Sequence, residues 1–122
     1  GKVLLKFALS VELEEQSQLE ILLDFISSQQ ELQYLTLELS SQYDLQYSDL
    51  ALAVLTLKRL EHLELEFEDL DERILRLFLN NLITYMPKLV YFSLFLTAEY
   101  QGYYDLLSEL MVPLSQNKTL KI

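Results

Sequence analysis

The sequence lacks several residues that whole classes of function require. Cysteine is absent, which excludes disulfides, thiol nucleophiles and cysteine-ligated metals and favours an intracellular, cytoplasmic protein. Only two glycines are present, whereas phosphate-binding loops of the Walker and dinucleotide types need several. The only histidine, His62, has no serine or threonine near it in the context of a nucleophile elbow. These absences predict a protein that is not an enzyme and binds no cofactor.

Basic residues and long apolar runs are also scarce. Lys and Arg total 9 against 19 Asp and Glu, which gives a formal net charge of -10 at pH 7. A chain this acidic does not hold nucleic acid by neutralising phosphates, and anionic membrane surfaces are disfavoured likewise. Charges interrupt the apolar runs, as Asp24 does between Ile21 and Ile26, so no stretch approaches the ~20 residues of a membrane span. We therefore expect no direct nucleic-acid contact and no membrane insertion.

Leucine, in contrast, occupies roughly a quarter of all positions, a bias typical of internal repeats. A template of apolar residues at its first, fourth, sixth and eighth positions occurs at 32–39, 60–67 and 89–96. The copies begin at Leu32, Leu60 and Leu89, so the interval between them is nearly constant. An earlier partial copy has Leu5 at the fourth position, equivalent to Leu35, and a later copy begins at Leu120. The chain is therefore predicted to be an array of similar units.

Each unit is predicted to combine a short strand with a helix. The template alternates apolar and polar residues with a period of two, which indicates a half-buried strand. Between the copies, apolar residues recur with helical spacing, which predicts helices at 18–29, 49–58, 72–86 and 104–116. Ser48 is the expected N-cap of the second helix, and Pro87 is expected to end the third. We divide the single domain, 1–122, into repeats at approximately 2–31, 32–59, 60–88 and 89–119, with a truncated fifth at 120–122.

This strand and helix repeat resembles the leucine-rich repeat family, and within it the long, ribonuclease-inhibitor-like class. The apolar series that extends through Leu39, Phe67 and Leu96 is also similar to repeats of protist proteins such as those of ciliates. The resemblance implies an α/β fold in the form of a right-handed solenoid, a segment of a horseshoe. In such a solenoid the parallel sheet lies on the concave side and the helices lie on the convex side.

One position departs from the family pattern, because the family places Asn or Cys just past the strand, where the side chain bonds to neighbouring backbone. The equivalent residues here are Ser10, Ser40, Glu68 and Thr97. Hydroxyl groups can make similar bonds to the backbone. Glu68 is harder to accommodate, so we expect it to point outward.

The repeat predicts which side chains share the concave face, because equivalent residues of adjacent parallel strands lie ~4.8 Å apart. The expected rows are Leu4, Tyr34, His62 and Tyr91; Lys6, Thr36, Glu64 and Ser93; and Ala8, Glu38, Glu66 and Phe95. Aromatic anchors beside clustered carboxylates suit a protein partner with a basic surface. The residues predicted to bind it are Tyr34, Glu38, His62, Glu64, Glu66, Tyr91 and Phe95. The alternative is an ordinary solvated sheet face.

A metal is not predicted on this face. His62 and Glu64 point to the same side, and Glu38 lies one strand away. Metal sites usually present three or four converging ligands supported by further hydrogen bonds, and one histidine among surface glutamates does not meet that requirement.

A second candidate surface is the edge where the strands lead into the helices. Tyrosine is enriched at protein interfaces, because its ring is apolar and its hydroxyl can hydrogen-bond. The predicted binding residues at this loop edge are Tyr43, Tyr47, Tyr103 and Tyr104. Tyr100 is instead expected in the core, because it occupies the place where leucines of the other repeats turn inward. Plain loop surface is the alternative for the four.

These features together predict a non-enzymatic protein–protein interaction module, a structural or scaffolding subunit of a larger complex. The alternative is a substrate-recruiting or regulatory domain of a ligase, kinase or GTPase-activating protein whose catalytic part lies outside this chain. The sequence begins and ends inside repeats, so we expect further repeats or partner chains to cover both ends.

Overall fold

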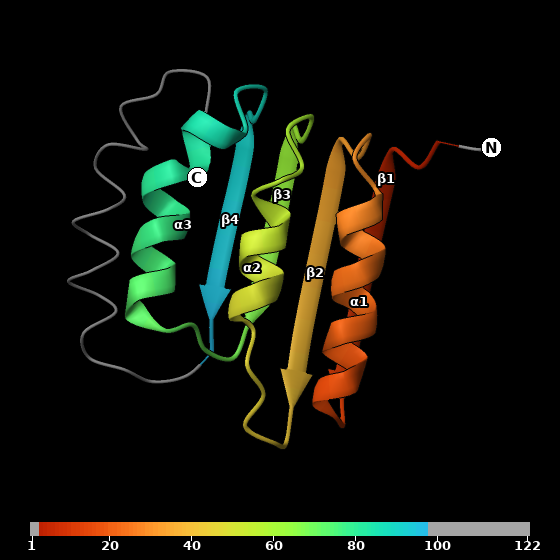
Figure 1. Ribbon diagram of the computed structural model, residues 1–122, viewed down its shortest axis with the longest axis vertical. Helices are drawn as coiled ribbons and strands as arrows, with labels where there is room; N and C mark the ends of the chain where they lie inside the picture. The colour runs from red at the N-terminus through yellow and green to blue at the C-terminus, as the bar shows by residue number, and fades with distance from the viewer. Residues whose placement is uncertain (1–2, 98–122) are drawn as a thin grey trace.

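The structure is a computed structural model that describes residues 3–97. Strands and helices alternate along this part of the chain. The elements are β1 (Lys6–Leu13), α1 (Gln16–Ser28), β2 (Tyr34–Ser41), α2 (Ser48–Val54), β3 (His62–Phe67), α3 (Glu72–Tyr85) and β4 (Tyr91–Leu96). The strands form one parallel sheet in the order β1-β2-β3-β4 (Figure 1). The fold is therefore α/β, as predicted. The helix predicted at 104–116 and the truncated repeat at 120–122 lie outside the described residues.

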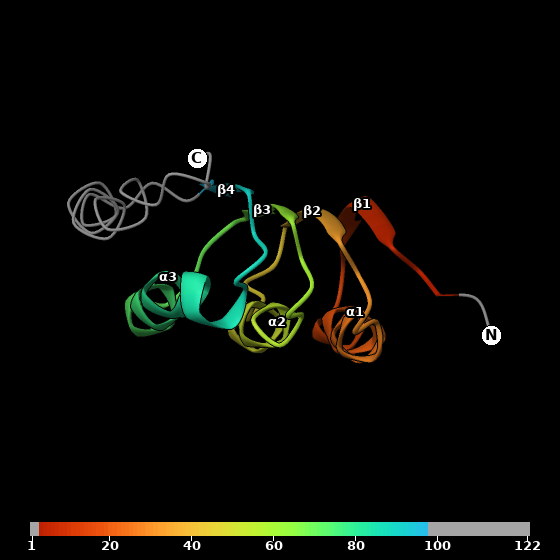
Figure 2. The ribbon, with the colours of Figure 1, turned by 90° about the horizontal axis from the view of Figure 1, so that it is seen from above.

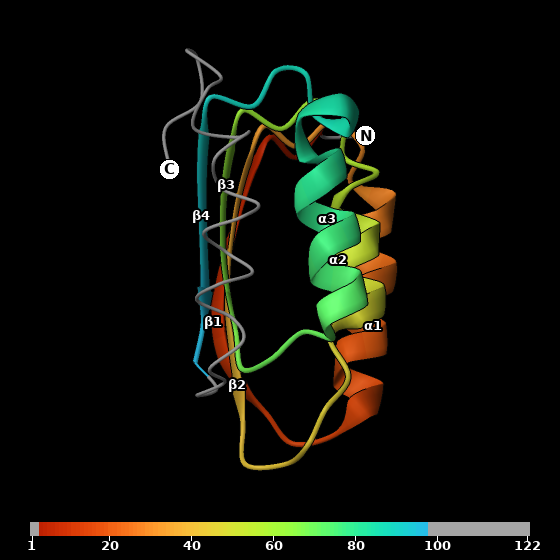
Figure 3. The same ribbon diagram turned by 90° about the vertical axis from the view of Figure 1, so that its left-hand side faces the viewer.

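The described helices all cover the same face of the sheet, so this part of the chain has two layers (Figures 2 and 3). Parallel strands that are added in chain order through crossovers of one hand place every helix on the same side. The three helices also span a wider row than the four strands (Figure 2). No described element covers the other face of the sheet. That is unusual, because parallel sheets are commonly buried on both faces.

The core lies between the sheet and the helices and consists of the alternate, inward-facing residues of the strands. In β2 and β3 these side chains are almost completely buried, and the helices pack leucine, isoleucine and phenylalanine against them. The strand members are Leu35, Leu37, Leu39, Leu63, Leu65 and Phe67. Among the described residues no charged side chain is buried, and Tyr47 is a tyrosine within the core. The template at 32–39 and 60–67 therefore identified the inward face correctly.

The same backbone bonds start each successive strand. The carbonyl of Leu5 accepts from the N–H groups of Gln33 and Tyr34, that of Gln33 from Glu61 and His62, and that of Glu61 from Val90 and Tyr91, all at 2.8–3.1 Å. These carbonyls are equivalent positions of successive units. Their recurrence fixes the register of the sheet, because every strand is aligned on the one before it in the same way.

The predicted register of β1 is wrong by two positions. Tyr34 pairs with Lys6 and not with Leu4. The other pairs shift in the same way, so that Ala8 lies beside Thr36 and Ser10 beside Glu38. The first interval of the repeat is therefore shorter than predicted and equals the second, and a shift of two keeps every side chain on its predicted face.

Packing against α1 explains the true register. The ring of Phe7, which pairs with Leu35, lies 4.9 Å from the ring of Phe25 of α1. Leu5, the residue predicted for that inward position, is exposed beyond the start of the strand. A phenylalanine buries more apolar surface than a leucine at the same position, and the aromatic pair adds to the gain.

The predicted cap of α2 is also wrong. Ser48 is the first residue of the helix, and Tyr47 is its N-cap without a side-chain hydrogen bond. The helix ends at Val54 and not near 58, because the chain turns there. The N–H and the hydroxyl of Thr56 both bond to the carbonyl of Ala53, at 3.0 and 2.7 Å. A bond to the third residue back tightens the turn and stops the α-helix.

The bounds of α1 and α3 agree closely with the prediction at both ends. The carboxylate of Asp71 caps α3 by accepting the N–H of Arg73 at 2.8 Å. The helix ends at Tyr85, before Pro87, as expected. Between residues 3 and 97 we find no helix with the length and apolarity that crossing a membrane requires.

Glu68 does not point outward, contrary to the prediction. Its carboxylate is half-buried and accepts the N–H of Ser41, in the preceding unit, at 2.6 Å. The bond to neighbouring backbone that the resemblance assigns to Asn or Cys is therefore made by a glutamate.

Removing this acceptor should destabilise the protein. We expect Glu68→Ala to lower the free energy of unfolding by about 1–2 kcal/mol, because a partly buried N–H loses a charged acceptor. Glu68→Gln keeps an acceptor oxygen and should cost less than half as much. Urea unfolding followed by circular dichroism measures both changes. Equal losses in the two variants would contradict a role for the hydrogen bond.

Candidate functional site

The uncovered sheet face carries a row of stacked rings across β2, β3 and β4. Tyr34 pairs with His62 and His62 pairs with Tyr91, as predicted. The centroid of the His62 ring lies 5.7 Å from that of Tyr34 and 4.5 Å from that of Tyr91, and the second pair is stacked with an interplanar angle of 8°. The row therefore forms a continuous, partly exposed aromatic strip.

Glu64 connects this strip to the next row. One of its carboxylate oxygens, Oε1, lies 3.3 Å from Nε2 of His62. The other oxygen, Oε2, accepts the hydroxyl of Thr36 at 3.2 Å. The imidazole is stacked on Tyr91 and has the Glu64 carboxylate beside its Nε2 atom, and these two contacts restrict its orientation before any partner arrives. The centre of the face is thus preorganised, which lowers the entropy cost of binding.

The third row combines two carboxylates with a phenylalanine. Glu38 pairs with Glu66, and Glu66 pairs with Phe95 of β4. Neither carboxylate takes part in a salt bridge or side-chain hydrogen bond within residues 3–97. Phe95 is 57% exposed. Like charges on directly opposed residues repel each other, and a cation between them would relieve the repulsion.

The structure thus brings together all the residues predicted on the sheet. We call Tyr34, Glu38, His62, Glu64, Glu66, Tyr91 and Phe95 the aromatic–acidic face. The register correction moves Lys6 from the second row to the first, because it pairs with Tyr34 and not with Thr36. The face therefore offers apolar rings at one end and unpaired negative charge at the other.

Of the predicted loop edge, the structure describes only Tyr43 and Tyr47. Tyr43 is exposed, as expected. Tyr47 is only 2% exposed, so its prediction as a binding residue is wrong. Its ring is stacked on Phe67 with centroids 5.4 Å apart, and its hydroxyl has no hydrogen-bond partner in the described part of the chain. Tyr103, Tyr104 and the predicted core residue Tyr100 lie outside the described residues.

Two groups near this edge have perturbed acidities. Burial raises the pKa of Tyr47 to about 12, and the nearby charge of Glu68 contributes to the rise. Burial also raises the pKa of Asp69, and the carboxylates of Asp44 and Asp71 add to the rise, while a hydrogen bond with backbone at Leu70 opposes it. No cluster of three or more potential metal ligands occurs in the range 3–97.

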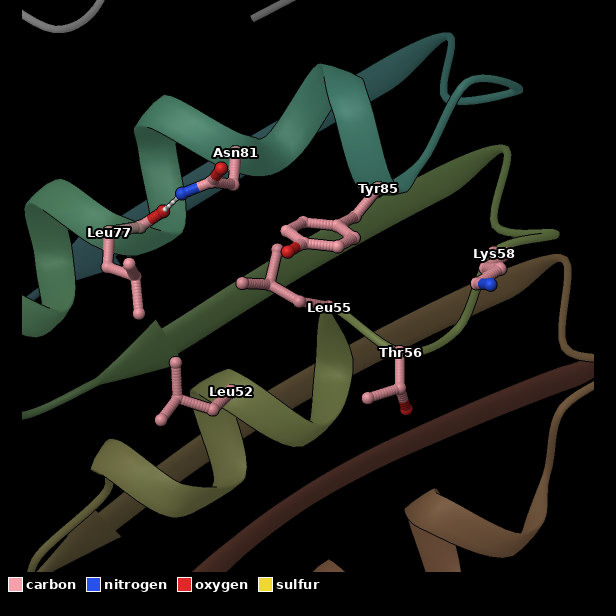
Figure 4. A pocket seen from close by; sticks show the side chains of 7 residues that line it. All are labelled: Leu52, Leu55, Thr56, Lys58, Leu77, Asn81 and Tyr85. Carbon is pink, nitrogen blue, oxygen red and sulfur yellow. Dashed lines mark hydrogen bonds between the residues drawn. The ribbon is translucent and has the colours of Figure 1, made fainter.

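The sequence did not predict a groove on the helical side. It has a volume of about 390 Å³ and lies between α2 and α3 (Figure 4). Its lining is mostly apolar and consists of Leu52, Leu55, Thr56, Lys58, Leu77, Asn81 and Tyr85. The side chain of Tyr85 extends from the end of α3 toward Leu55 (Figure 4). The groove exists because α2 is only half as long as α3.

One signal could have found this groove. Leu77 and Tyr85 are large apolar residues outside the inward stripe of the third helix, and both are exposed. Such residues on an otherwise polar helical face indicate a surface hollow or contact.

Comparison of the chain with family models, with curated proteins and with solved structures finds no match. The function therefore has to be argued from the site itself.

Proposed function

We propose that this protein is a non-enzymatic protein–protein interaction module, a structural or scaffolding subunit of a larger complex. In this proposal the aromatic–acidic face docks a basic surface of another protein subunit. The stacked rings supply apolar contact area, and the unpaired carboxylates supply charge complementarity.

A single observation supports the proposal most. The parallel sheet has one face without cover from any described element, and that face carries aromatic rings instead of the short polar residues of a solvated surface. Exposed aromatic side chains in a fixed arrangement are the usual anchors of protein interfaces. The rings are held by stacking and by Glu64, so a partner would meet a rigid surface.

We also propose that the described units form a right-handed leucine-rich-repeat solenoid with the aromatic–acidic face on its concave side. Three features support it: the strands follow one another in chain order, the helices lie on one face, and equivalent residues recur at a nearly constant interval. The wider row of helices favours curvature toward the sheet. The intracellular, cytoplasmic location rests on the lack of cysteine.

The surroundings of His62 favour binding over catalysis. Its Nε2 atom is directed at a carboxylate, and its ring is stacked on Tyr91. A histidine that activates a nucleophile needs a hydroxyl or thiol hydrogen-bonded to its ring, and within residues 3–97 the imidazole of His62 has no such bond, since the hydroxyl of Thr36 donates to Glu64.

The proposal predicts that removing two rings strongly weakens partner binding. We expect the double variant Tyr34→Ala/Tyr91→Ala to bind its partner at least about a hundredfold more weakly, because buried aromatic anchors contribute about 2 kcal/mol or more each. Affinity capture from the native source with quantitative mass spectrometry identifies the partner. The dissociation constant is then measured with the purified partner.

The matched control is Leu77→Ala/Tyr85→Ala, which removes two exposed large side chains of α3 that lie outside both predicted binding surfaces. This control should keep wild-type affinity, and circular dichroism should show that all variants are folded. Charge complementarity further predicts that affinity falls with rising salt and in Glu38→Gln/Glu66→Gln. If the Tyr34/Tyr91 variant is folded and retains every partner, the aromatic–acidic face is not the docking surface.

A further inference from the structure

The strand β1 has one edge that pairs with no described residue. Along the other edge it pairs with β2, and the carbonyl of Leu5 accepts the N–H of Tyr34 there. Backbone groups alternate in direction along a strand. The odd-numbered residues of β1 therefore bond to β2, and the even-numbered residues direct their N–H and C=O groups outward. An unpaired edge of this kind is a template for another strand.

An apolar groove of about 400 Å³ lies beside this edge, between β1 and α1. Its lining consists of Leu9, Val11, Glu12, Leu13, Gln18, Ile21, Leu22 and Phe25. Ile21 is 70% exposed. The residues of β2 that pair with Leu9 and Val11 are Leu37 and Leu39, and both are buried. The end of the described sheet is thus a core surface that lacks its neighbour.

The charges at this edge have a particular arrangement. Lys6 begins β1 and Glu12 lies near its end, while Ala8 and Ser10 between them are small. Lys6 and Glu12 are both exposed, and neither has a side-chain hydrogen bond or ion pair within residues 3–97. The stripe of α1 beside the edge, Gln18, Ile21 and Phe25, carries no charge although the chain is strongly acidic.

We propose that a second copy of this chain occupies this edge, with the two β1 strands antiparallel about a two-fold axis at Leu9. Lys6 of each copy then lies opposite Glu12 of the other, and Ala8 lies opposite Ser10. The two sheets join into one, and the helices of both copies stay on the same side. This interface is separate from the aromatic–acidic face, so it stands independently of the function proposed above.

Three requirements select this register. A two-fold axis perpendicular to the sheet brings the same edge of both copies together and makes the strands antiparallel. Hydrogen-bonded pairs must join outward-directed residues, so even-numbered residues must meet even-numbered residues. Among the registers that meet this condition, only the one centred on Leu9 places Lys6 opposite Glu12. A shift by two positions would place Lys6 opposite Ser10 or beyond the end of the strand.

Burial of the groove follows from the same symmetry. Phe7 lies opposite Val11 on the helical side of the joined sheet, and Leu9 lies opposite its own copy. The exposed stripe of α1, with Ile21 and Phe25, then meets the same stripe of the second copy. Apolar burial supplies the driving force, and the charge pairs fix the register.

Charge reversal tests the proposal. Sedimentation velocity of the whole chain at about 0.15 M salt should show a dimer whose dissociation constant rises at least about tenfold in Lys6→Glu and in Glu12→Lys, because each change places like charges opposite each other. The double variant Lys6→Glu/Glu12→Lys exchanges the charges and should restore the dimer. Lys58→Glu, an exposed lysine away from the edge, is the matched control and should remain dimeric.

A cysteine at the axis provides a second test, because the natural chain has none. In an antiparallel pair without hydrogen bonds the Cα atoms are about 4.5 Å apart, within disulfide range. Leu9→Cys should therefore form a disulfide-linked dimer on oxidation, and Ser93→Cys on β4 should not. A monomer at every concentration, or a dimer that is indifferent to Lys6 and Glu12, would overturn the proposal.

Discussion

Replacing Phe67 with alanine should lower the free energy of unfolding by about 3–5 kcal/mol, the usual cost of truncating a buried aromatic residue. Phe67 is fully buried at the end of β3 and stacks on Tyr47, which lies just before α2. The substitution removes contacts from the strand and from the helical layer together. Because small domains are stable by only about 5–15 kcal/mol, this change should remove a large part of the total stability.

Phe95→Ala is the matched control, because it removes the same side chain from an exposed position of the next strand. We expect a stability change below about 1 kcal/mol for this control. Urea unfolding with constant m-values would establish that both numbers refer to the same transition. If Phe67→Ala were as stable as Phe95→Ala, the stacked pair could not be part of the core. Phe95→Ala should instead weaken partner binding, which separates the two roles.

The sheet could be predicted from the sequence wherever the repeat is unambiguous. Leu32, Leu60 and Leu89 mark the same turn in three units, and the pairs built on them, such as Tyr34 with His62, are confirmed. The signal is strong because inward and outward residues alternate and because long apolar side chains repeat at a nearly constant interval. The shared position of all the residues of the aromatic–acidic face followed from that register alone.

The register of β1 could not be predicted in the same way. The alternation of inward and outward residues has a period of two, so it is unchanged when the strand shifts by two positions. Leu5 and Phe7 therefore fit the inward position opposite Leu35 equally well. The choice depends on Phe25, which lies in the following helix and packs on Phe7. A contact between side chains of different elements is a tertiary fact that the local pattern does not contain.

Tyr47 and Glu68 were wrongly predicted for a related reason. Both lie in connections, where polarity suggested exposure, yet both are held by the neighbouring unit. Tyr47 stacks on Phe67 of β3, and Glu68 bonds to the backbone of Ser41. The connections that follow β2 and β3 therefore contact the neighbouring strands, as the strands contact one another. Residue type alone therefore says little about burial there.

Raising the pH above 10 should destabilise the protein through Tyr47. Burial raises the pKa of Tyr47 to about 12 in the folded chain from an ordinary value of 10.0, and the charge of Glu68 contributes to the rise. Between these values the unfolded chain has lost the proton while the folded chain still holds it. The contribution of this group to stability is therefore complete below pH 10 and is lost as the pH rises toward 12, by up to about 3 kcal/mol.

Tyr47→Phe isolates this effect, because it keeps the stacked ring and deletes the hydroxyl. At pH 7 we expect the variant to be about 1 kcal/mol more stable than wild type, since a buried hydroxyl without a partner is removed. Urea unfolding at pH 8 and at pH 11.5 measures how much unfolding free energy is lost between the two pH values. This loss should be smaller for Tyr47→Phe than for wild type. Tyr43→Phe, which changes an exposed tyrosine, should keep the wild-type loss. Parallel losses in Tyr47→Phe and wild type would mean that the Tyr47 hydroxyl is solvated and that the α2 connection does not close over Phe67.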